Sequence, residues 1–251
     1  MKSHSPEKVK IIGHRGCASA FPENTLEAIL HGIQSGATMI EIDLRLSKDK
    51  EVILSHNENL LQVFGINQNV SEKTWQELSQ LTIRKEGKIF HLLRLRDLFQ
   101  FMPQDIHFYL ELKAMKSSYP LEWNKKLVDK VISILKKEKI KKRCLLMSFD
   151  QDLIKYLKKN YPSYSAGLVV KSAAILNAIL KDKEIKYNCL ALNQKLFKHS
   201  NFKMVQNSGI PFIAWTVNDK RVWEKIAACG PLGIVTDYPG KFRKFQKKCY
   251  L

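Results

Sequence analysis

The chain lacks any run of apolar residues long enough to span a lipid bilayer, which takes about 20 of them. Its first ten residues, MKSHSPEKVK, also lack the apolar segment of a secretory signal peptide. We therefore expect a soluble, cytoplasmic protein. No low-complexity linker or internal repeat divides the sequence, and α/β barrels reach 251 residues as one unit. We expect a single domain over residues 1–251.

Cysteine is scarce and irregularly spaced. The number of cysteines is odd and no CxxC pair occurs, which argues against a disulfide framework and a zinc or redox site; they stand at positions 17, 144, 189, 229 and 249. Cys17 directly follows His14-Arg15-Gly16 and could act as a nucleophile. The alternative, a small buried hydrophobe, is favoured because nothing else around it requires a thiol.

Acidic residues are few relative to basic ones. The sequence has 24 Asp and Glu against 42 Lys and Arg, a net charge of +18, which implies attraction to polyanions. A basic C-terminal tail, residues 241–248, carries Phe242 and Phe245 three positions apart and could make peripheral contact with an anionic membrane. Packing of these two Phe side chains on the domain is the favoured alternative. No nucleic-acid recognition motif occurs, so we expect no specific nucleic-acid partner.

Short apolar runs alternate with longer amphipathic stretches along most of the chain. This pattern is typical of parallel strands joined by crossover helices. Eight such strands predict an α/β fold, the TIM (β/α)8 barrel: VKII, MIEIDLRL, FYLELK, RCLLMSF, AGLVV, CLALN, FIAWTV and GIVTD. The segment VILSH predicts a return strand that pairs with the end of the second strand. Residues 57–105 fit the alternation least, with helix-like WQELSQL and RLRDLFQFM around a polar stretch, and predict a small insertion over the barrel mouth.

Polar residues cluster where the predicted strands end, which is where barrel enzymes hold their active sites. Residues two apart in a strand point to the same side, so Glu41 projects with Asp43, and Glu111 with Lys113. Three carboxylates at one mouth, without a nearby cysteine pair, suit Mg²⁺ or Ca²⁺. The alternative is that the carboxylates only form salt bridges with basic neighbours such as Arg15 and Arg45.

Two histidines, His14 and His56, end predicted strands and form a candidate acid and base pair. Histidine at a strand end is often structural, but the basic and acidic neighbours of these two favour catalysis. Arg15 and Lys113 supply the fixed positive charge that holds a phosphate. The set therefore predicts a small-molecule phosphate ester as the substrate.

Several segments together resemble the glycerophosphodiester phosphodiesterase family: IIGHRG, FPENTLEAILHGIQSGATMIEIDLRLSKDKEVILSHN, LELK, AWTVND and GIVTDYP. The resemblance runs from about residue 9 to 240 and is densest over the first sixty residues. Single fragments carry little weight, since NTLE also reads as a helix cap formed by Asn24 and Glu27.

The resemblance implies a barrel of the phospholipase C-like phosphodiesterase type that cleaves glycerophosphodiesters, such as glycerophosphocholine, to an alcohol and sn-glycerol 3-phosphate. It implies Glu41, Asp43 and Glu111 as metal ligands, His14 and His56 as acid and base, and Arg15 and Lys113 as phosphate contacts, listed here by their positions in this chain. The attacking group, water or the substrate's own 2-hydroxyl, stays open.

The chain departs from the family pattern in and around the predicted insertion. The catalytic histidine is commonly followed by Asp, whereas this chain has Asn57. The stretch NLLQVFGINQNV replaces an Asp-Arg-Thr-rich segment, and HLLRLRDLF an Ile-Pro-Thr-Leu-like one. Two alternatives follow: a lysophospholipase D that uses the apolar insert residues Leu60, Leu61, Val63 and Phe64, or a non-catalytic barrel that binds anionic lipid.

Overall fold

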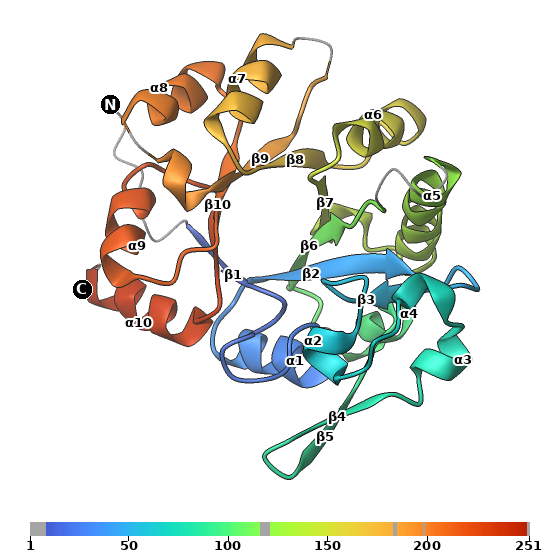
Figure 1. Ribbon diagram of the computed structural model, residues 1–251. Coiled ribbons are helices and arrows are strands. Elements are labelled where there is room, and N and C mark those ends of the chain that lie inside the picture. Colours follow the sequence, from blue (N-terminus) through green and yellow to red (C-terminus); the bar gives the residue numbers. More distant parts are fainter. Residues whose placement is uncertain (1–8, 116–120, 183–184, 198, 250–251) are drawn as a thin grey trace.

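The computed structural model describes residues 9–115, 121–182, 185–197 and 199–249, and its central feature is a closed barrel of eight parallel strands (Figure 1). The strand order is β1-β11-β10-β9-β8-β7-β6-β2, and pairing of β1 with β2 closes the ring. The staves are β1 (Lys10–Gly13), β2 (Met39–Leu46), β6 (His107–Leu112), β7 (Cys144–Ser148), β8 (Ala166–Val170), β9 (Cys189–Asn193), β10 (Phe212–Trp215) and β11 (Gly233–Thr236). All eight predicted strands are confirmed.

Helices cover the outside of the barrel, between successive strands. They are α1 (Leu26–Gln34), α5 (Leu121–Lys137), α6 (Gln151–Asn160), α7 (Ala173–Lys181), α8 (His199–Ser208), α9 (Lys220–Ala227) and α10 (Pro239–Cys249), with the short turns η4 (Lys141–Arg143) and η5 (Gln194–Leu196). Side chains at the helix starts accept backbone N–H groups; Asp150 does so for α6 and Ser172 for α7. The N-cap of α1 is Thr25, so the predicted cap formed by Asn24 is wrong.

Strand alternation separates the barrel interior from the layer between strands and helices. On β2, Ile40 and Ile42 are fully buried in the outer core, which the helices cover. Met39 belongs instead to the core inside the barrel, together with Tyr109 of β6. Glu41 and Asp43 follow Met39 at two-residue steps, so they also face inward. The inward side therefore changes from apolar to acidic toward the carboxyl end of β2.

The chain between β2 and β6 holds the least regular part of the fold. Strand β3 (Val52–Leu54) pairs antiparallel with the end of β2, as the return-strand prediction required. The rest of the segment comprises α2 (Leu61–Phe64), η2 (Val70–Glu72), α3 (Trp75–Leu78), β4 (Thr82–Lys85), β5 (Lys88–His91), α4 (Leu95–Leu98) and η3 (Phe99–Phe101). A separate small core holds it on β3, built around the buried Ile53, Leu60, Val70, Leu78 and Leu92.

Strands β4 and β5 form a hairpin that extends away from the barrel (Figure 1). Its two turn residues, Glu86 and Gly87, have φ values of 52° and 75°, which the tight turn between twisted strands requires. The sequence had indicated only a polar stretch here, so the hairpin is a feature that the prediction missed.

The basic C-terminal tail forms helix α10, and its apolar side packs on the barrel. Phe242 is fully buried and Phe245 is 5% exposed, and both rings lie within 6 Å of the Trp223 ring of α9. Burying two aromatic side chains stabilises the fold by roughly 2 kcal/mol each. The packing alternative is thereby confirmed, and the basic side chains are left on the outer side. Within the described residues, no helix is both long and apolar enough to cross a membrane.

Candidate active site

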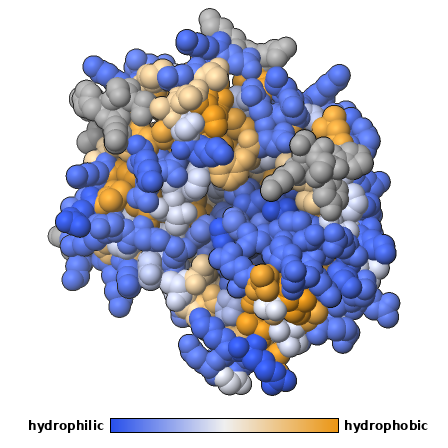
Figure 2. Space-filling model, viewed as in Figure 1, coloured by the Kyte–Doolittle hydropathy of each residue, from blue (hydrophilic) through white to orange (hydrophobic). Residues whose placement is uncertain are grey.

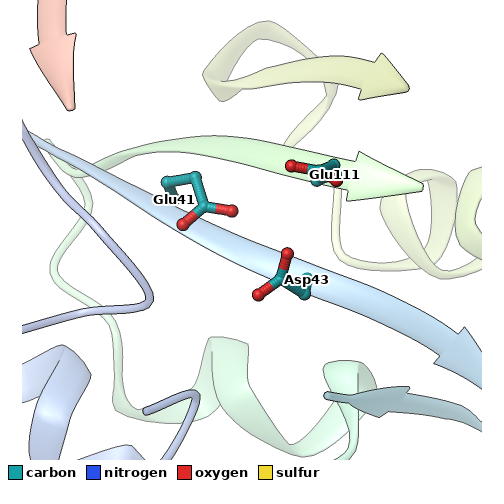
Figure 3. A group of neighbouring side chains, drawn as sticks. All are labelled: Glu41, Asp43 and Glu111. Atoms are coloured by element: carbon teal, nitrogen blue, oxygen red, sulfur yellow. The ribbon is translucent and has the colours of Figure 1, made fainter. Parts of the chain in front are cut away.

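Three buried carboxylates meet inside the barrel near the carboxyl ends of β2 and β6 (Figure 3). Asp43 and Glu111 are register partners on these neighbouring strands, and Glu41 precedes Asp43 by two residues. One oxygen from each carboxylate lies within 4.8 Å of the other two. This spacing and the purely oxygen ligand set fit a hard divalent cation.

The electrostatics of the three carboxylates are unequal. Burial and the charges of Asp43 and Glu111 raise the pKa of Glu41 to about 8. Burial would also raise the pKa of Asp43, but the charges of Lys113 and Arg15 outweigh it and hold that pKa below its usual value. The cluster thus carries more acidic groups than its cationic neighbours neutralise, and a divalent cation would balance the excess.

Lys113 lies among the carboxylates, as the two-residue spacing on β6 predicted. Its Nζ is 2.8 Å from Asp43 Oδ1 and also bonds to Glu111. Burial lowers the pKa of Lys113, but these two carboxylates outweigh that effect and raise it, so the ammonium charge is retained. Lys113 therefore brings a fixed positive charge to the centre of the cluster.

A tight loop after β1 places Arg15 beside the same carboxylates. Arg15 has a φ of 49° and Gly16 a φ of 88°, and a Cβ at Gly16 would lie 2.5 Å from the backbone of α1, so only glycine fits there. The backbone N–H of Arg15 donates to Glu41 Oε2 at 2.8 Å, and its Nε lies 3.3 Å from Asp43 Oδ2. Its Nη1 donates to Glu23 at 2.5 Å, which fixes the far end of the guanidinium.

Asn24 is a site residue that the sequence interpretation took for a helix cap. Its Nδ2 donates to Asp43 Oδ2 at 2.9 Å, and its Oδ1 accepts the backbone N–H of Asp43 at 3.1 Å. Asn24 is 3% exposed and has a φ of 60°, a conformation that Asn tolerates better than most residues. The amide therefore fixes the orientation of the Asp43 carboxylate from outside the metal-ligand set.

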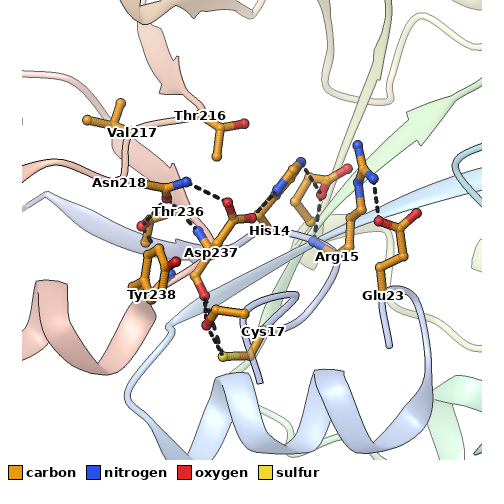
Figure 4. A network of polar contacts seen from close by, with 12 residues as sticks. His14, Arg15, Cys17, Glu23, Thr216, Val217, Asn218, Thr236, Asp237 and Tyr238 are labelled. Carbon is orange, nitrogen blue, oxygen red and sulfur yellow. Dashed lines mark hydrogen bonds and ion pairs between the residues drawn. The ribbon is translucent and has the colours of Figure 1, made fainter. Parts of the chain in front are cut away.

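His14 is held by a carboxylate from the other end of the chain (Figure 4). Its Nδ1 lies 2.6 Å from Asp237 Oδ1, and Asn218 Nδ2 donates to the second oxygen of Asp237 at 2.5 Å. The His14 Nε2 faces Glu41, 4.0 Å from its Oε2. Burial lowers the pKa of His14, but the hydrogen bond to Asp237 and the charge of Glu41 outweigh it and raise that pKa. Both Asp237 and Asn218 stand at predicted strand ends, yet nothing in the sequence indicated their link to His14.

His56 follows β3 and has different partners. Its Nδ1 lies 2.8 Å from Asn57 Oδ1, and Asn57 Nδ2 donates to Gln62 Oε1 of α2 at 2.6 Å. The backbone carbonyl of His56 accepts two hydrogen bonds from the Arg45 guanidinium, at 2.8 and 3.1 Å. Burial lowers the pKa of His56, and the positive charges of Lys113 and Arg15 add to this against the opposing charge of Asp43.

The alternative that the carboxylates only form salt bridges with Arg15 and Arg45 agrees with the structure for Arg15 but not for Arg45. Arg15 does pair with Asp43, but Arg45 pairs with Glu58 and holds the loop of His56 instead. Cys17 is buried, and its Sγ lies 3.5 Å from the backbone oxygen of Asp237, which fits a packing role. Direct contacts link six of the seven predicted site residues, and His56 stands beside them.

Comparison with known proteins places the chain among relatives that are named phosphodiesterases or lysophospholipases D. The chain is 23% identical to "Lysophospholipase D GDPD3" of Homo sapiens, with 96% of this chain and 87% of the relative covered. It is 25% identical to "Glycerophosphodiester phosphodiesterase" of Caldanaerobacter subterraneus subsp. tengcongensis, with 92% and 95% covered. A phosphodiesterase of Oleispira antarctica, solved with its product sn-glycerol-3-phosphate, superposes with a TM-score of 0.84 at 23% identity over 95% of this chain and 96% of that one.

The structural similarity confirms the barrel fold, and a match to a family model identifies the family. The model of the Glycerophosphoryl diester phosphodiesterase family matches residues 14–241, nearly the whole length of the chain, from the histidine after β1 to the start of α10. The chain therefore belongs to the glycerophosphoryl diester phosphodiesterase family, a family of hydrolases.

Proposed function

We propose that residues 1–251 act as one domain that hydrolyses glycerophosphodiesters to an alcohol and sn-glycerol 3-phosphate with a divalent metal, Mg²⁺ or Ca²⁺. The observation that carries the proposal is the buried group of Glu41, Asp43 and Glu111, with Arg15 and Lys113 directly against it. Support for the product comes from the Oleispira antarctica phosphodiesterase, whose structure contains sn-glycerol-3-phosphate. A non-catalytic lipid-binding barrel would have no need to bury three carboxylates together.

Glu41, Asp43 and Glu111 would hold the cation. Their oxygens lie close enough to share one ion, and burial together with the charges of Asp43 and Glu111 raises the pKa of Glu41, an effect that a bound cation would oppose. When bound, the cation supplies Lewis-acid polarisation of the phosphoryl oxygens. Asn24 holds Asp43 through two hydrogen bonds, so this ligand is oriented before the metal binds.

In this proposal one histidine acts as the acid and the other as the base, and the hydrogen-bond partner of each ring decides which role it takes. His14 faces the Asp237 carboxylate, which stabilises the protonated ring, so His14 donates a proton to the leaving alcohol oxygen. His56 faces the neutral amide of Asn57, which leaves its Nε2 free to take the proton from the attacking hydroxyl. This hydroxyl belongs either to water or to the 2-position of the substrate glycerol.

Arg15 and Lys113 are the phosphate contacts in this proposal. The Nε of Arg15 is buried and finds no hydrogen-bond acceptor within the described part of the chain, although Asp43 lies in ion-pair range. A phosphate oxygen would accept from it. Lys113 carries a charge that the surrounding carboxylates stabilise, and in this proposal it stabilises the negative charge that develops during phosphoryl transfer.

Release of sn-glycerol 3-phosphate from glycerophosphocholine by the purified protein tests the proposal. We expect release with Mg²⁺ or Ca²⁺, no release with EDTA, and loss of release in His14→Ala. Normal release in EDTA would refute the metal site, and normal release by His14→Ala would refute its role as acid. Absence of release with either metal, while Glu41→Gln abolishes metal binding, would turn the proposal toward a longer lipid substrate.

Such a substrate is the second candidate, favoured by two observations. Relatives of this chain are named lysophospholipase D. In the structure, Val63 and Phe64 of α2 line a small cavity together with His56 and Asn24, so apolar side chains adjoin the candidate base. Release of choline from lysophosphatidylcholine, measured beside glycerophosphocholine under the same conditions, separates the two substrates. Faster turnover of glycerophosphocholine, which has no acyl chain, than of lysophosphatidylcholine would argue against the lysophospholipase D hypothesis.

A further inference from the structure

Arg45 is a cation at the barrel mouth to which the proposed mechanism gives no part. It follows Asp43 by two residues on β2, so its side chain projects to the same inward side as the metal ligands. Only 12% of the side chain is exposed. An arginine in this place could contact the substrate or hold another part of the site, and its hydrogen-bond partners distinguish the two roles.

All three nitrogens of the Arg45 guanidinium contact acceptors within the protein. Nε and Nη2 donate to the backbone oxygen of His56, at 3.1 and 2.8 Å. Nη1 donates to Glu58 Oε2 at 3.3 Å and lies 3.7 Å from Met115 Sδ. Arg15 differs, because its Nε finds no hydrogen-bond acceptor in the described part of the chain. Arg15 is therefore suited to a phosphate oxygen, and Arg45 to holding the protein.

The backbone around His56 is tied to β2 at more than one point. The guanidinium of Arg45 is a planar fork, so its two hydrogen bonds to one oxygen fix the direction of that carbonyl. The backbone N–H of Ser55 donates to the backbone oxygen of Asp43 at 3.0 Å. Ser55 Oγ donates to the backbone oxygen of Asn57 at 2.8 Å. Arg45 thus completes a set of contacts that holds the segment of the candidate base.

Glu58 connects the Arg45 guanidinium to the insertion, residues 57–105. One of its carboxylate oxygens accepts from Arg45, and the other accepts the backbone N–H of Ser71 in η2 at 2.8 Å. The backbone oxygen of Glu58 accepts the N–H of Val70 at 2.9 Å, and Val70 is fully buried in the small core of the insertion. The turn η2 is therefore linked to the His56 backbone through Glu58 and Arg45.

The ring of His56 is held by a separate route through α2. Its Nδ1 bonds to Asn57 Oδ1, and Asn57 donates to Gln62 of α2. Helix α2 has no buried residue, and Figure 2 shows apolar side chains at the surface over it. A contact that depends on a short, exposed helix opens more easily than one made by a mostly buried arginine. The Arg45 contact is therefore the firmer of the two supports of His56.

We propose that Arg45 is a positioning residue that holds the backbone of His56 where the ring can take the proton from the attacking hydroxyl. Arg45 acts only through His56, and Glu58 links the two to the insertion. The inference rests on the proposed function, because it takes His56 as the base. Loss of the Arg45 contact should then impair proton transfer while metal binding by the three carboxylates is retained.

Release of sn-glycerol 3-phosphate from glycerophosphocholine by Arg45→Gln tests this role. A shift of a reacting group by about 1 Å costs roughly 100-fold, so kcat should fall about 100-fold while KM and metal affinity stay within about threefold. Arg45→Lys keeps the charge but has no planar fork, so it should lose most of the same activity. The control Arg94→Gln removes the same charge from an arginine of the insertion that pairs with Glu51 and Asp97, and it should keep the wild-type rate.

A double-mutant cycle with His56→Ala separates positioning from a general structural effect. If Arg45 acts through His56, Arg45→Gln should cause little further loss of kcat once the ring is absent, because residues that act as a unit are not additive. A role of Arg45 in the metal site or in folding would instead lower kcat by the same factor in both backgrounds.

Amide hydrogen exchange in EDTA tests the contact without turnover. In Arg45→Gln, peptides that cover residues 55–60 and 69–72 should exchange about tenfold faster or more, because hydrogen bonds to a charged group are lost. Peptides that cover β9 and β10, on the far side of the barrel, should exchange as in the wild type. Absence of release by the wild type would refute the proposed function, and exchange would still decide whether Arg45 holds this segment.

Three results would overturn the inference. The first is a kcat of Arg45→Gln within about threefold of the wild type. The second is an equal loss of kcat in the presence and absence of the His56 ring. The third is unchanged exchange over residues 55–60 in Arg45→Gln.

Discussion

Replacing Asn57 by Asp changes a direct hydrogen-bond partner of the His56 ring and tests whether His56 acts as a neutral base. The Asn57 Oδ1 lies 2.8 Å from His56 Nδ1 and accepts a hydrogen bond from its N–H, while Asn57 Nδ2 donates to Gln62. Aspartate keeps the acceptor and adds a negative charge. Gln62 is exposed and can rotate its amide to donate to the new carboxylate.

The size of the change in the His56 pKa follows from the distance between the two side chains and from the exposure of the His56 ring. A carboxylate in contact with a histidine raises its pKa by roughly 1–3 units when both are shielded from water. His56 is only partly buried, so solvent screens part of the effect and an upward shift of about one unit is expected. A base works in its unprotonated form. The acidic limb of the rate profile should therefore move to higher pH, with about a tenfold lower rate below the limb and an unchanged rate above it.

The assay is kcat/KM for glycerophosphocholine against pH at saturating metal, for the wild type and Asn57→Asp. The control is Asn67→Asp, which adds the same charge at an exposed position where Oδ1 still accepts from Asn59. An acidic limb that stays in place in Asn57→Asp, or that moves to lower pH, would refute the reasoning. An equal shift in the control would assign the effect to overall charge.

Three further predictions concern other residues of the site and the fold. Asn24→Ala removes both hydrogen bonds to Asp43, so metal affinity should fall roughly 10–100-fold in calorimetric titration; unchanged affinity would contradict the positioning role. Asp237→Asn removes the charge that stabilises protonated His14, and kcat should fall by at least about 100-fold while metal affinity is retained; equal turnover would assign Asp237 to structure. Phe242→Ala should lower the free energy of unfolding by about 3–5 kcal/mol in denaturant titration, because the ring is fully buried; a change near zero would show that α10 adds little to the core.

Much of the barrel is predictable because its strands are short, apolar and separated by amphipathic helices. The return strand β3 is recognisable for the same reason, since the polar turn at 47–51 separates it from β2. The β4–β5 hairpin is not, because TIRK and KIFH hold mostly charged or polar residues and alternate weakly. Its one usable signal is Gly87 at the turn.

The candidate site also contains residues that the sequence predicts and residues that it does not. Glu41 with Asp43, and Glu111 with Lys113, are predictable because a two-residue step in a strand fixes their common side. Asn24 is misread because an Asn before a helical run is typical of an N-cap, and only its left-handed backbone turns it toward Asp43 instead. The contact between Asp237 and His14 spans 223 residues and exists only because β11 closes the barrel against β1.

That closure has a consequence for the order in which the protein matures. During synthesis the ribosome delivers β1 long before β11, because the other staves of the barrel stand between them in the sequence. A nascent or truncated chain that ends before β11 already contains all three carboxylates, yet it lacks Asp237, the partner of His14 Nδ1. Orientation of His14 is thus a late event, so catalytic activity should report completion of the barrel, whereas the acidic ligand set is complete in sequence as soon as β6 has emerged.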